Sequence, residues 1–325
     1  MKDQFTRTID YIRISLTDKC NLRCLYCMPQ DDEQPEWNED VLTSEELITL
    51  CRHFADVGIK KIKLTGGEPL LRKDIVWLVK ELYAIKGIED ITLTTNGMLL
   101  DEKVEALYES GIRHINVSLD TIHEEEFYKI TRRKGVDKVI QGIHHALQLG
   151  MHVKLNVVPM RLNEQHIMEL LVFAKDYPIH IRFIEMMPIG LGKDIPGIPQ
   201  EEMVHKIETM YGKLQPVHDQ IGYGPSVYYH VEGFKGHIGF ISALSHKFCS
   251  SCNRVRLTSD GFLKGCLQYN KGIHLKEIVR SKDEALLKEK IMEAIYRKPK
   301  AHAFEEEDVE HVENREQKLM SGIGG

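Results

Sequence analysis

The chain has 325 residues, 42% of them hydrophobic and 28% charged, which is ordinary for a globular protein and allows one large α/β domain or a domain with an appendage. Its 43 basic and 49 acidic residues give a net charge of −6, so the overall charge provides no attraction toward nucleic acid or an anionic membrane. No run approaches the roughly 18 to 20 apolar residues that cross a bilayer, and the first residues lack the apolar segment of a secretory signal. We therefore expect a cytoplasmic protein without nucleic-acid or membrane partners, whose seven cysteines stay reduced and need another explanation than disulfides.

The first half of the chain alternates strand-like and helix-like segments, and Gly58, Gly87, Gly111 and Gly150 each separate a helix from the strand after it. Strands are expected at 11–16, 60–65, 91–95, 114–119, 152–158 and 180–185, and helices near 44–57, 73–86, 101–110, 137–149 and 163–175. This alternation predicts a parallel sheet with helices outside it. Six units are fewer than the eight of a full barrel, so we expect an α/β fold with a partial (βα)6 TIM-type barrel over residues 1–188. Periodicity leaves a doubly wound sheet open as the alternative.

The alternation of strand-like and helix-like segments ends after about residue 186. A glycine- and proline-rich connection at 190–199 is followed by expected antiparallel strands at 222–232, 236–242 and 254–264, with a turn at 259–261. Helices are expected at 275–281 and 283–297. Residues 189–325 are therefore expected to form a C-terminal α+β extension.

Three cysteines, Cys20, Cys24 and Cys27, follow the first expected strand with three and two residues between them. Three thiolates at this spacing can converge on one centre, and a 4Fe–4S cluster held by three cysteines keeps one iron open for a small molecule. A zinc loop or unrelated buried cysteines is the alternative, but zinc sites more often pair C-x-x-C with a second pair or with histidines, and none lies nearby. The loop also follows the carboxyl end of a strand, where parallel α/β folds bind ligands.

A second group consists of Cys249, Cys252 and Cys266, with two and thirteen residues between them. Spacing alone does not decide between a structural zinc or cluster site completed by a histidine such as His246 and a second cluster with an open iron. The seventh cysteine, Cys51, lies on an apolar helix face and is expected in the core.

The C-x-x-x-C-x-x-C spacing, with Tyr26 just before Cys27, resembles the signature of the radical S-adenosylmethionine (SAM) superfamily. The sequence Gly66-Gly67-Glu68-Pro69 resembles that superfamily's motif for the methionine amino group. Residues 248–257, FCSSCNRVRL, together with 265–267, GCL, closely resemble the GTP 3′,8-cyclase family, which carries out the first step of molybdenum cofactor biosynthesis. The resemblance runs from residues 13–18 to the terminal double glycine, and so covers nearly the whole chain.

The resemblance implies two 4Fe–4S clusters, the first chelating SAM and the second binding the guanine base of GTP at its open iron. It also implies that a 5′-deoxyadenosyl radical removes the ribose 3′ hydrogen, after which the ribose attacks C8 and gives (8S)-3′,8-cyclo-7,8-dihydroguanosine 5′-triphosphate. The SAM contacts carried over from the family are Tyr26, Gly67, Glu68, Ser118 and Met187. In the family the terminal glycines enter the active site and assist catalysis, which assigns that role to Gly324 and Gly325.

Several cations occur within or beside expected strands, where a charge is costly to bury without a partner. Arg13, Lys154 and Arg182 fit this description, although each could instead point outward as an alternating surface residue. Convergence of several on one barrel face favours binding of the triphosphate. The resemblance implies these GTP contacts, of which Thr94 lies close to both ligands: Arg13, Lys61, Lys63, Thr94, Lys154, Arg182, Arg254, Val255 and Arg256. The family usually has arginine at position 63, and the lysine present here keeps the charge but loses the bidentate fork.

The expected partners are GTP, a reductant of the flavodoxin or ferredoxin type, and cyclic pyranopterin monophosphate synthase as the functional successor. The chain is expected to be a monomer or homodimer.

One alternative function is that of a radical SAM enzyme that modifies a peptide with an auxiliary cluster, although such enzymes usually carry more C-terminal cysteines than the three found here. Another is a non-catalytic zinc or iron–sulfur protein, which would not explain six βα units. Hydrolysis of nucleotide through a P-loop is unsupported, because no G-x-x-x-x-G-K-[ST] sequence occurs.

Overall fold

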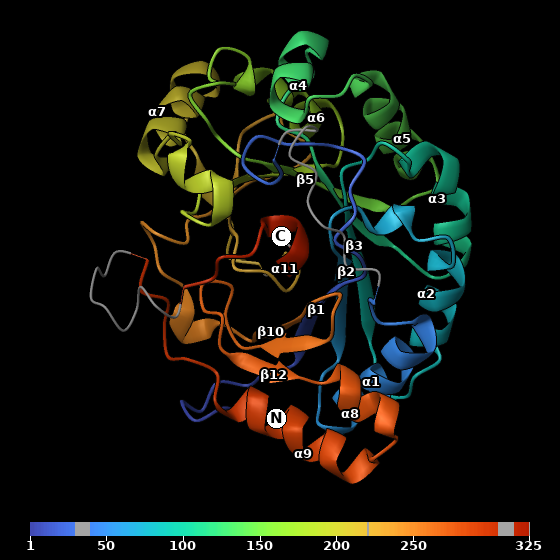
Figure 1. The fold of residues 1–325 in the computed structure, drawn as a ribbon. Helices are drawn as coiled ribbons and strands as arrows, with labels where there is room; N and C mark the ends of the chain where they lie inside the picture. Colours follow the sequence, from blue (N-terminus) through green and yellow to red (C-terminus); the bar gives the residue numbers. More distant parts are fainter. Residues whose placement is uncertain (30–39, 220, 305–314, 325) are drawn as a thin grey trace.

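The computed structural model describes residues 1–29, 40–219, 221–304 and 315–324 (Figure 1). Six parallel strands form the centre of the sheet, each within a residue or so of its expected bounds: β1 (Tyr11–Ser15), β2 (Lys61–Thr65), β3 (Asp90–Thr95), β4 (His114–Ser118), β5 (His152–Val157) and β6 (His180–Ile184). The helices between them cover the outside of the sheet: α1 (Ser44–Asp56), α2 (Ile75–Tyr83), α3 (Leu100–Glu109), α4 (Glu124–Thr131), α5 (Val136–Gln148) and α6 (Leu171–Asp176). The expected parallel partial barrel is therefore confirmed, and the doubly wound alternative is not.

A local signal explains where the first helix begins. The side chain of Thr43 accepts from the backbone of Glu46, and the Glu46 carboxylate accepts from the backbone of Thr43, so α1 starts with a complete capping box. Helix α4 was not expected from the sequence. Short 3-10 turns, η1 (Pro69–Leu71) and η2 (Ile167–Leu170), precede α2 and α6.

The C-terminal extension contains the expected antiparallel strand pairs and is also joined to the barrel by two parallel pairs. As expected, strands β9 (Ile238–Ile241) and β10 (Arg254–Leu257) have antiparallel partners within the extension, but β9 also pairs in parallel with β6 and β10 in parallel with β1, which was not expected. They lengthen the parallel part of the sheet at both edges, where free backbone groups of β1 and β6 would otherwise be exposed. The expected antiparallel pairs join β9 to β8 (Val227–His230) and β10 to β11 (Phe262–Lys264), and β7 (Gln215–Pro216) and β12 (Gly272–His274) add a further antiparallel strand next to β8 and β11.

The remaining elements also belong to the extension: η3 (Gly190–Asp194), α7 (Gln200–Tyr211), η4 (Cys249–Ser251), α8 (Lys276–Ser281), α9 (Glu284–Tyr296) and α11 (Met320–Ile323). The strand order runs from β12 to β7, so among the described residues the barrel is open. Figure 1 shows α11, the last helix, inside the ring of strands and helices. The fold is thus mixed α/β, a partial barrel with an antiparallel extension, while the division at residue 188 stays a prediction.

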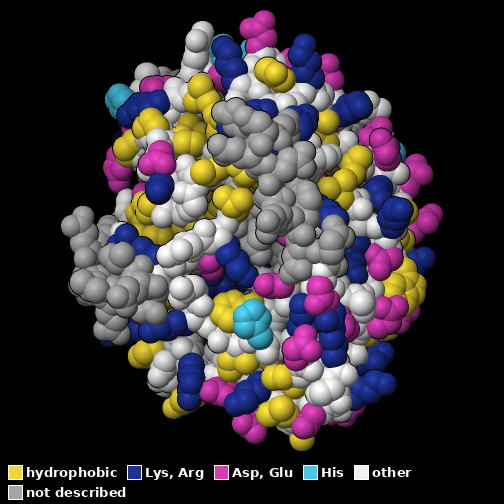
Figure 2. Space-filling view, in the orientation of Figure 1, with side chains coloured by type: hydrophobic (Ala, Val, Ile, Leu, Met, Phe, Trp, Pro, Cys, Tyr) yellow, Lys and Arg dark blue, Asp and Glu magenta, His cyan; other side chains and the backbone are white. Residues whose placement is uncertain are grey.

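The two faces of the sheet differ in polarity. In β1, Ile12 and Ile14 are buried in the core toward the helices, and the alternate residue Arg13 lies on the other face. The outer surface seen in Figure 2 intersperses Lys and Arg with Asp and Glu, so its cations do not form one patch. Positive charge is instead gathered inside the barrel. No helix in the described part of the chain is long and apolar enough to cross a membrane.

Candidate active site

The loop with Cys20, Cys24 and Cys27 follows β1 and is held by the end of α4. The backbone amides of Arg23 and Leu25 donate to the carbonyl oxygens of Thr131 and Ile130, both at 2.9 Å. Arg132, the next residue, donates from its guanidinium to the carbonyl oxygens of Arg23 and Met28. The unexpected helix α4 therefore supports the cysteine loop from one side.

The Gly-Gly-Glu-Pro sequence supports the same loop from the other side. The Gly67 amide donates to the Thr17 carbonyl at 2.7 Å, and the Glu68 amide donates to the Lys19 carbonyl at 2.8 Å. A Cβ on Gly67 would lie 2.3 Å from the Lys19 carbonyl oxygen, so this close approach requires glycine.

The Glu68 side chain is fully buried and binds the end of the next strand. Its carboxylate accepts from the hydroxyl of Thr95 and the amides of Asn96 and Leu70. Burial nevertheless raises the pKa of Glu68 to about 7. The side chain therefore ties the segment after β2 to the end of β3, while the Glu68 backbone amide binds the cysteine loop at Lys19.

The three cysteines of this loop are half-buried, and their thiols influence one another's pKa. Burial raises the pKa of Cys20 to about 11 and that of Cys27 to about 12, and the neighbouring Cys20 and Cys27 raise that of Cys24 further. Converging buried thiolates need positive charge, which an iron–sulfur cluster supplies. Among the described residues, which include all six grouped cysteines, no three sulfurs lie within 4.8 Å of one another. One zinc ion with Zn–S bonds of about 2.3 Å would hold them closer, so the arrangement fits a cluster better than zinc.

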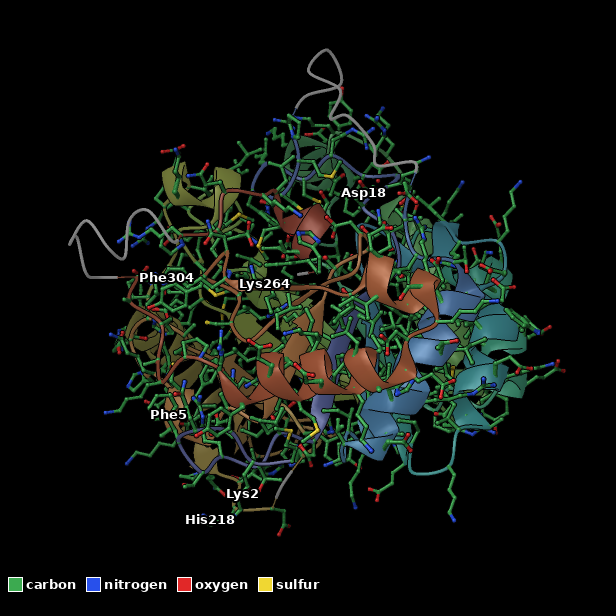
Figure 3. All side chains as sticks on the ribbon, turned by 60° about the horizontal axis from the view of Figure 1, so that its bottom comes forward. Lys2, Phe5, Asp18, His218, Lys264 and Phe304 are labelled. Carbon is green, nitrogen blue, oxygen red and sulfur yellow. The ribbon has the colours of Figure 1, made fainter. Side chains whose placement is uncertain are left out.

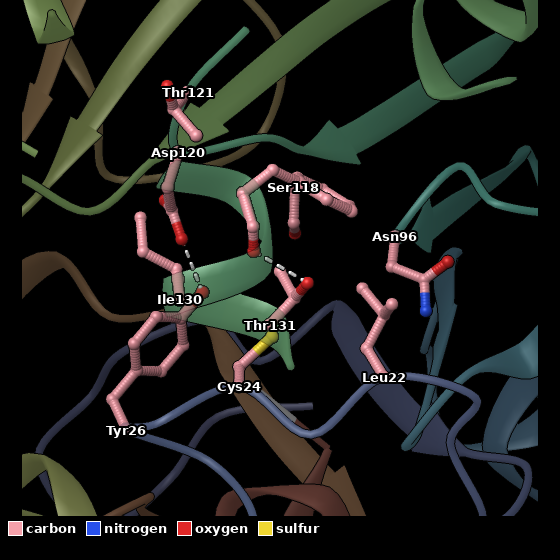
Figure 4. Close-up of a pocket in the computed structure, with 10 residues that line it drawn as sticks. Leu22, Cys24, Tyr26, Asn96, Ser118, Asp120, Thr121, Ile130 and Thr131 are labelled. Atoms are coloured by element: carbon pink, nitrogen blue, oxygen red, sulfur yellow. Dashed lines mark hydrogen bonds between the residues drawn. The ribbon is translucent and has the colours of Figure 1, made fainter. Parts of the chain in front are cut away.

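Tyr26, which belongs to the cysteine loop, faces Asp120 (Figure 4). The Tyr26 hydroxyl donates to Asp120 Oδ2 at 2.7 Å, and Asp120 Oδ1 accepts from the Val158 amide. Burial raises the pKa of Asp120 to about 6. Both residues, with Cys24 and Ser118, line a cavity of about 30 Å³, which marks one wall of the site. A Cβ on Gly192 would lie 3.0 Å from the Met187 carbonyl oxygen and 3.8 Å from that of Tyr26, so the Met187 backbone reaches the same region.

The second cysteine group lies at the end of the barrel near β10. Cys249 is in η4, Cys252 ends it, and Cys266 follows β11. Burial alone would raise the pKa of Cys252, but Lys298 and Arg254 lower it to about 7. His246 is exposed and does not join any three-residue metal-binding group among the described residues, so the alternative of a zinc site completed by it gains no support.

Strand register brings the expected cations together on the inner face. Arg13 is paired across the sheet with Lys63 on one side and Arg256 on the other. On the opposite wall, Lys154 is the register partner of Asn116, and Arg182 that of Asn156. These residues lie at the same level of neighbouring parallel strands, which is why their side chains converge.

The cation cluster, defined as Arg13, Lys63, Lys154, Arg182, Arg254 and Arg256, is electrostatically strained. Burial lowers the pKa of Lys63 well below its usual value, and four other members of the cluster lower it further. Burial also lowers the pKa of Lys154 to about 8 and that of Arg13 to about 10. The Nε atoms of Arg182 and Arg254 are buried and have no hydrogen-bond partner in the described structure. A buried set of like charges with unused donors fits a multiply charged anion.

Arg182 has fixed partners within this cluster. Its Nη2 donates to the side-chain oxygens of Asn116 and Asn156. Asn116 in turn donates to the Thr94 hydroxyl at 3.5 Å. Arg182 is thus oriented by Asn116 on β4 and Asn156 on β5, and Thr94 lies next to Asn116.

The C-terminal tail enters the cation cluster. Arg256 Nη1 donates to the carbonyl oxygen of Gly324 at 2.6 Å, and Gly324 has a φ of +71°. A Cβ at Gly324 would lie 3.0 Å from Thr65 Cγ2 and 3.2 Å from Ser15 Cβ. The Ser321 amide lies against Cys27, so α11 also reaches the first cysteine group. Gly325 lies outside the described residues.

Two expected GTP residues lie apart from the cluster. Lys61, at the amino end of β2, forms an ion pair with Asp10 at 3.1 Å and lies over the ring of Tyr223. The Val255 side chain is fully buried in the hydrophobic core, so only its backbone is available to a ligand.

Sequence reasoning missed the residues that position the cysteine loop. Asn96 donates to Cys20 Sγ at 3.6 Å, Asp120 accepts from Tyr26, and the end of α4 holds the loop backbone. Asn96 directly follows β3, and Asp120 is the second residue after β4. A polar residue just past the carboxyl end of a parallel strand is the signal that could have found them.

The partial barrel and the three-cysteine loop define a radical SAM protein. A family model described as "Radical SAM superfamily" matches residues 14–174, and one described as "Molybdenum Cofactor Synthesis C" matches residues 179–304. Relatives named GTP 3′,8-cyclase from Clostridium perfringens and Moorella thermoacetica are 44% and 43% identical, each over 100% of both chains. The chain belongs to the GTP 3′,8-cyclase family of radical SAM enzymes, which serves molybdenum cofactor biosynthesis.

The fold agrees with a solved structure. SuiB from Streptococcus suis, bound to S-adenosylmethionine, has a TM-score of 0.61 at 18% identity, covering 87% of this chain and 68% of that one. At this identity the likeness concerns the fold alone. Membership of the superfamily implies a 4Fe–4S cluster and SAM, and the half-buried first cysteine group fits that cluster.

Proposed function

We propose that this chain converts GTP to (8S)-3′,8-cyclo-7,8-dihydroguanosine 5′-triphosphate at the barrel mouth, with SAM and two 4Fe–4S clusters as cofactors. The observation that carries the proposal is the cation cluster between the two cysteine groups, reached by the C-terminal tail. When bound, the first cluster and SAM supply the 5′-deoxyadenosyl radical that removes the 3′ hydrogen of GTP.

The first cysteine group would hold the cluster that binds SAM. Tyr26, oriented by Asp120, would contact SAM together with Ser118, which lines the same cavity, and with Met187. Gly67 would contribute through its backbone, because no side chain fits there. Glu68 would support the SAM site by holding the surrounding backbone in place, because its carboxylate is already bonded to Thr95, Asn96 and Leu70.

The cation cluster would bind the triphosphate of GTP. Without ligand, burial and mutual repulsion disfavour its charges, and a triphosphate would relieve both costs at once. The unused Nε donors of Arg182 and Arg254 supply directed hydrogen bonds for phosphate oxygens. Thr94, beside Arg182, would lie between the two ligands. Lys61 would contribute charge only from the amino end of the barrel, since Asp10 already pairs with it.

The second cysteine group would hold the other cluster, which would bind the guanine base. Arg254, Val255 and Arg256 lie on the strand between Cys252 and Cys266, so base and phosphate sites would be continuous along β10. Gly324, held by Arg256, would close the substrate into the barrel and exclude water from the radical step, with Gly325 following it.

The wider partners proposed are a flavodoxin- or ferredoxin-type reductant, which delivers electrons to the clusters, and cyclic pyranopterin monophosphate synthase, which would consume the product. The chain is proposed to work as a monomer or homodimer in the cytoplasm.

The test is an anaerobic turnover assay with the reconstituted protein, dithionite, SAM and GTP. Mass spectrometry would follow 5′-deoxyadenosine and a cyclised isomer of reduced GTP. We expect both products from the unchanged chain and neither from Cys24→Ser. Cys51→Ala is the matched control, because Cys51 is a buried core thiol outside both cysteine groups and its loss should leave turnover intact.

The other outcomes discriminate between functions. Deoxyadenosine without conversion of GTP would keep the radical SAM chemistry and reject the substrate, which would favour a peptide-modifying enzyme. Neither product from protein shown to carry both clusters would reject the cyclase proposal.

A further inference from the structure

Three side chains with metal-binding atoms meet outside the proposed active site. His123 precedes α4, His166 precedes η2, and Glu169 lies within η2. One ligand atom from each lies within 4.8 Å of the others. These residues, the His-His-Glu cluster, come from segments that follow two neighbouring strands, β4 and β5.

The side chains face one another closely. The two imidazole rings have centroids 4.1 Å apart, and His123 Nε2 lies 2.8 Å from Glu169 Oε2. Zinc with His and carboxylate ligands at about 2.0 to 2.2 Å holds its ligand atoms roughly 3.3 Å apart. A small widening of the gap between His123 and Glu169 would therefore admit an ion.

Glu126 provides a second and independent observation. Its Oε1 lies 3.2 Å from His166 Nδ1, which leaves Nε2 of that ring for a ligand. Metal-bound histidines usually donate their other nitrogen to a carboxylate in this manner. Glu126 is 8% exposed, and its Oε2 is buried without a hydrogen-bond partner in the described structure. A buried carboxylate in this state requires positive charge nearby, and an ion on His166 would supply it.

We propose that His123, His166 and Glu169 bind one divalent transition-metal ion of the zinc class, with water as the remaining ligand. The donor set of two imidazoles and a carboxylate suits this class and differs from the all-sulfur cysteine groups. The side chains of His123 and Glu169 are 41% and 48% exposed, so the ion reaches the site from solvent.

The bound ion would join α4 to η2. The carbonyl groups at the end of α4 hold the cysteine loop, and Thr121, whose hydroxyl accepts from the His123 amide, lines the cavity beside Tyr26. The ion would therefore stiffen the support of the first cysteine group. It would take no part in the radical chemistry, so the proposal stands apart from the proposed function.

The test uses the full chain with both clusters reconstituted anaerobically, so that the grouped cysteines are occupied. Zinc chloride is added, unbound metal is removed by gel filtration, and zinc and iron are counted by mass spectrometry. We expect about one zinc per chain, lost in the double variant H123A/H166A. His205→Ala, an exposed histidine on α7, is the matched control and should keep the zinc. Glu126→Gln should weaken zinc binding about 10- to 100-fold, because it removes the charge behind His166.

X-ray absorption at the zinc edge identifies the ligands. We expect nitrogen and oxygen neighbours at about 2.0 to 2.1 Å and no sulfur at about 2.3 Å. Sulfur neighbours would overturn the proposal, because the zinc would then sit on cysteines. Equal zinc in the unchanged chain and in H123A/H166A, including none in either, would also overturn it and leave an ordinary His123–Glu169 ion pair.

Discussion

Arg256 on β10 holds the backbone carbonyl of Gly324 at 2.6 Å, which fixes the end of the chain among the buried cations of the barrel. Gly324 adopts φ +71°, and a Cβ there would press on Thr65 and Ser15. A side chain in this conformation costs about 1 to 2 kcal/mol.

Gly324→Ala should therefore lower GTP turnover about 5- to 30-fold, because the tail leaves its position. Product formation per minute, measured anaerobically at saturating GTP and SAM, checks this. Gly322→Ala is the control, since its Cβ would meet nothing within 4 Å, and it should keep the full rate. Equal losses in both variants would show that the conformation of Gly324 is unimportant.

Lys63 should lower the stability of the ligand-free protein and raise its affinity for GTP. Its charge is disfavoured by burial and by neighbouring cations, so Lys63→Met should raise the melting temperature measured without GTP. The same variant should bind GTP about 10- to 100-fold more weakly, because it loses a charge-assisted contact with phosphate. Thermal denaturation and calorimetric titration check the two effects. Lys60→Met, an exposed lysine paired with Glu89, should change neither. A lower melting temperature in Lys63→Met would contradict the argument.

The pH dependence of GTP binding should reflect Lys154. Burial lowers the pKa of this lysine to about 8 from a usual 10.5, so GTP affinity should fall as the pH rises through 8 and the charge is lost. Stability should change in the opposite direction. The unfolded chain binds more protons than the folded chain between pH 8 and 10.5, so the Lys154 contribution makes stability rise with pH there. Lys154→Arg keeps the charge and should flatten the fall in affinity. Calorimetry at pH 7, 8 and 9 checks this, and an unchanged slope in Lys154→Arg would assign the dependence elsewhere.

The sequence predicted β1 to β6 because each is a short buried run that begins after a helix-ending glycine or a polar turn. It missed α4, whose apolar stripe is limited to Phe127 and Ile130 and gives little periodicity. It did not predict that β9 and β10 also pair in parallel with β6 and β1, because this pairing depends on contacts distant in the chain. The grouped cysteines could be found from spacing, whereas Asn96 and Asp120 belong to no motif and only their place after the carboxyl end of a strand marks them.

A buried ion pair anchors the tail upstream of Gly324. Lys264 on β11, in the interior of the molecule in Figure 3, is fully buried and pairs with Glu316. Glu316→Ala should lower the free energy of unfolding by about 3 to 5 kcal/mol, because the Lys264 charge is left uncompensated.

The double variant K264M/E316A should recover most of this stability, since no buried charge remains, but not the GTP turnover that depends on the anchored tail. Chemical denaturation and the anaerobic assay separate the two. If the double variant regained full turnover, the pair would not position the tail.

Gly67 should be required for the first cluster although it offers no side chain. Its Cβ would lie 2.3 Å from the Lys19 carbonyl oxygen, so Gly67→Ala must displace the loop that carries Cys20, Cys24 and Cys27. We expect this variant to reconstitute with about half the iron of the unchanged chain, because one of two 4Fe–4S clusters is lost. Gly224→Ala, with nothing within 4 Å of its Cβ, should keep all the iron. Iron and sulfide analysis with electron paramagnetic resonance of the reduced protein checks both variants. If Gly67→Ala kept all its iron but lost turnover, the prediction would be wrong, and Gly67 would contact SAM rather than support the loop.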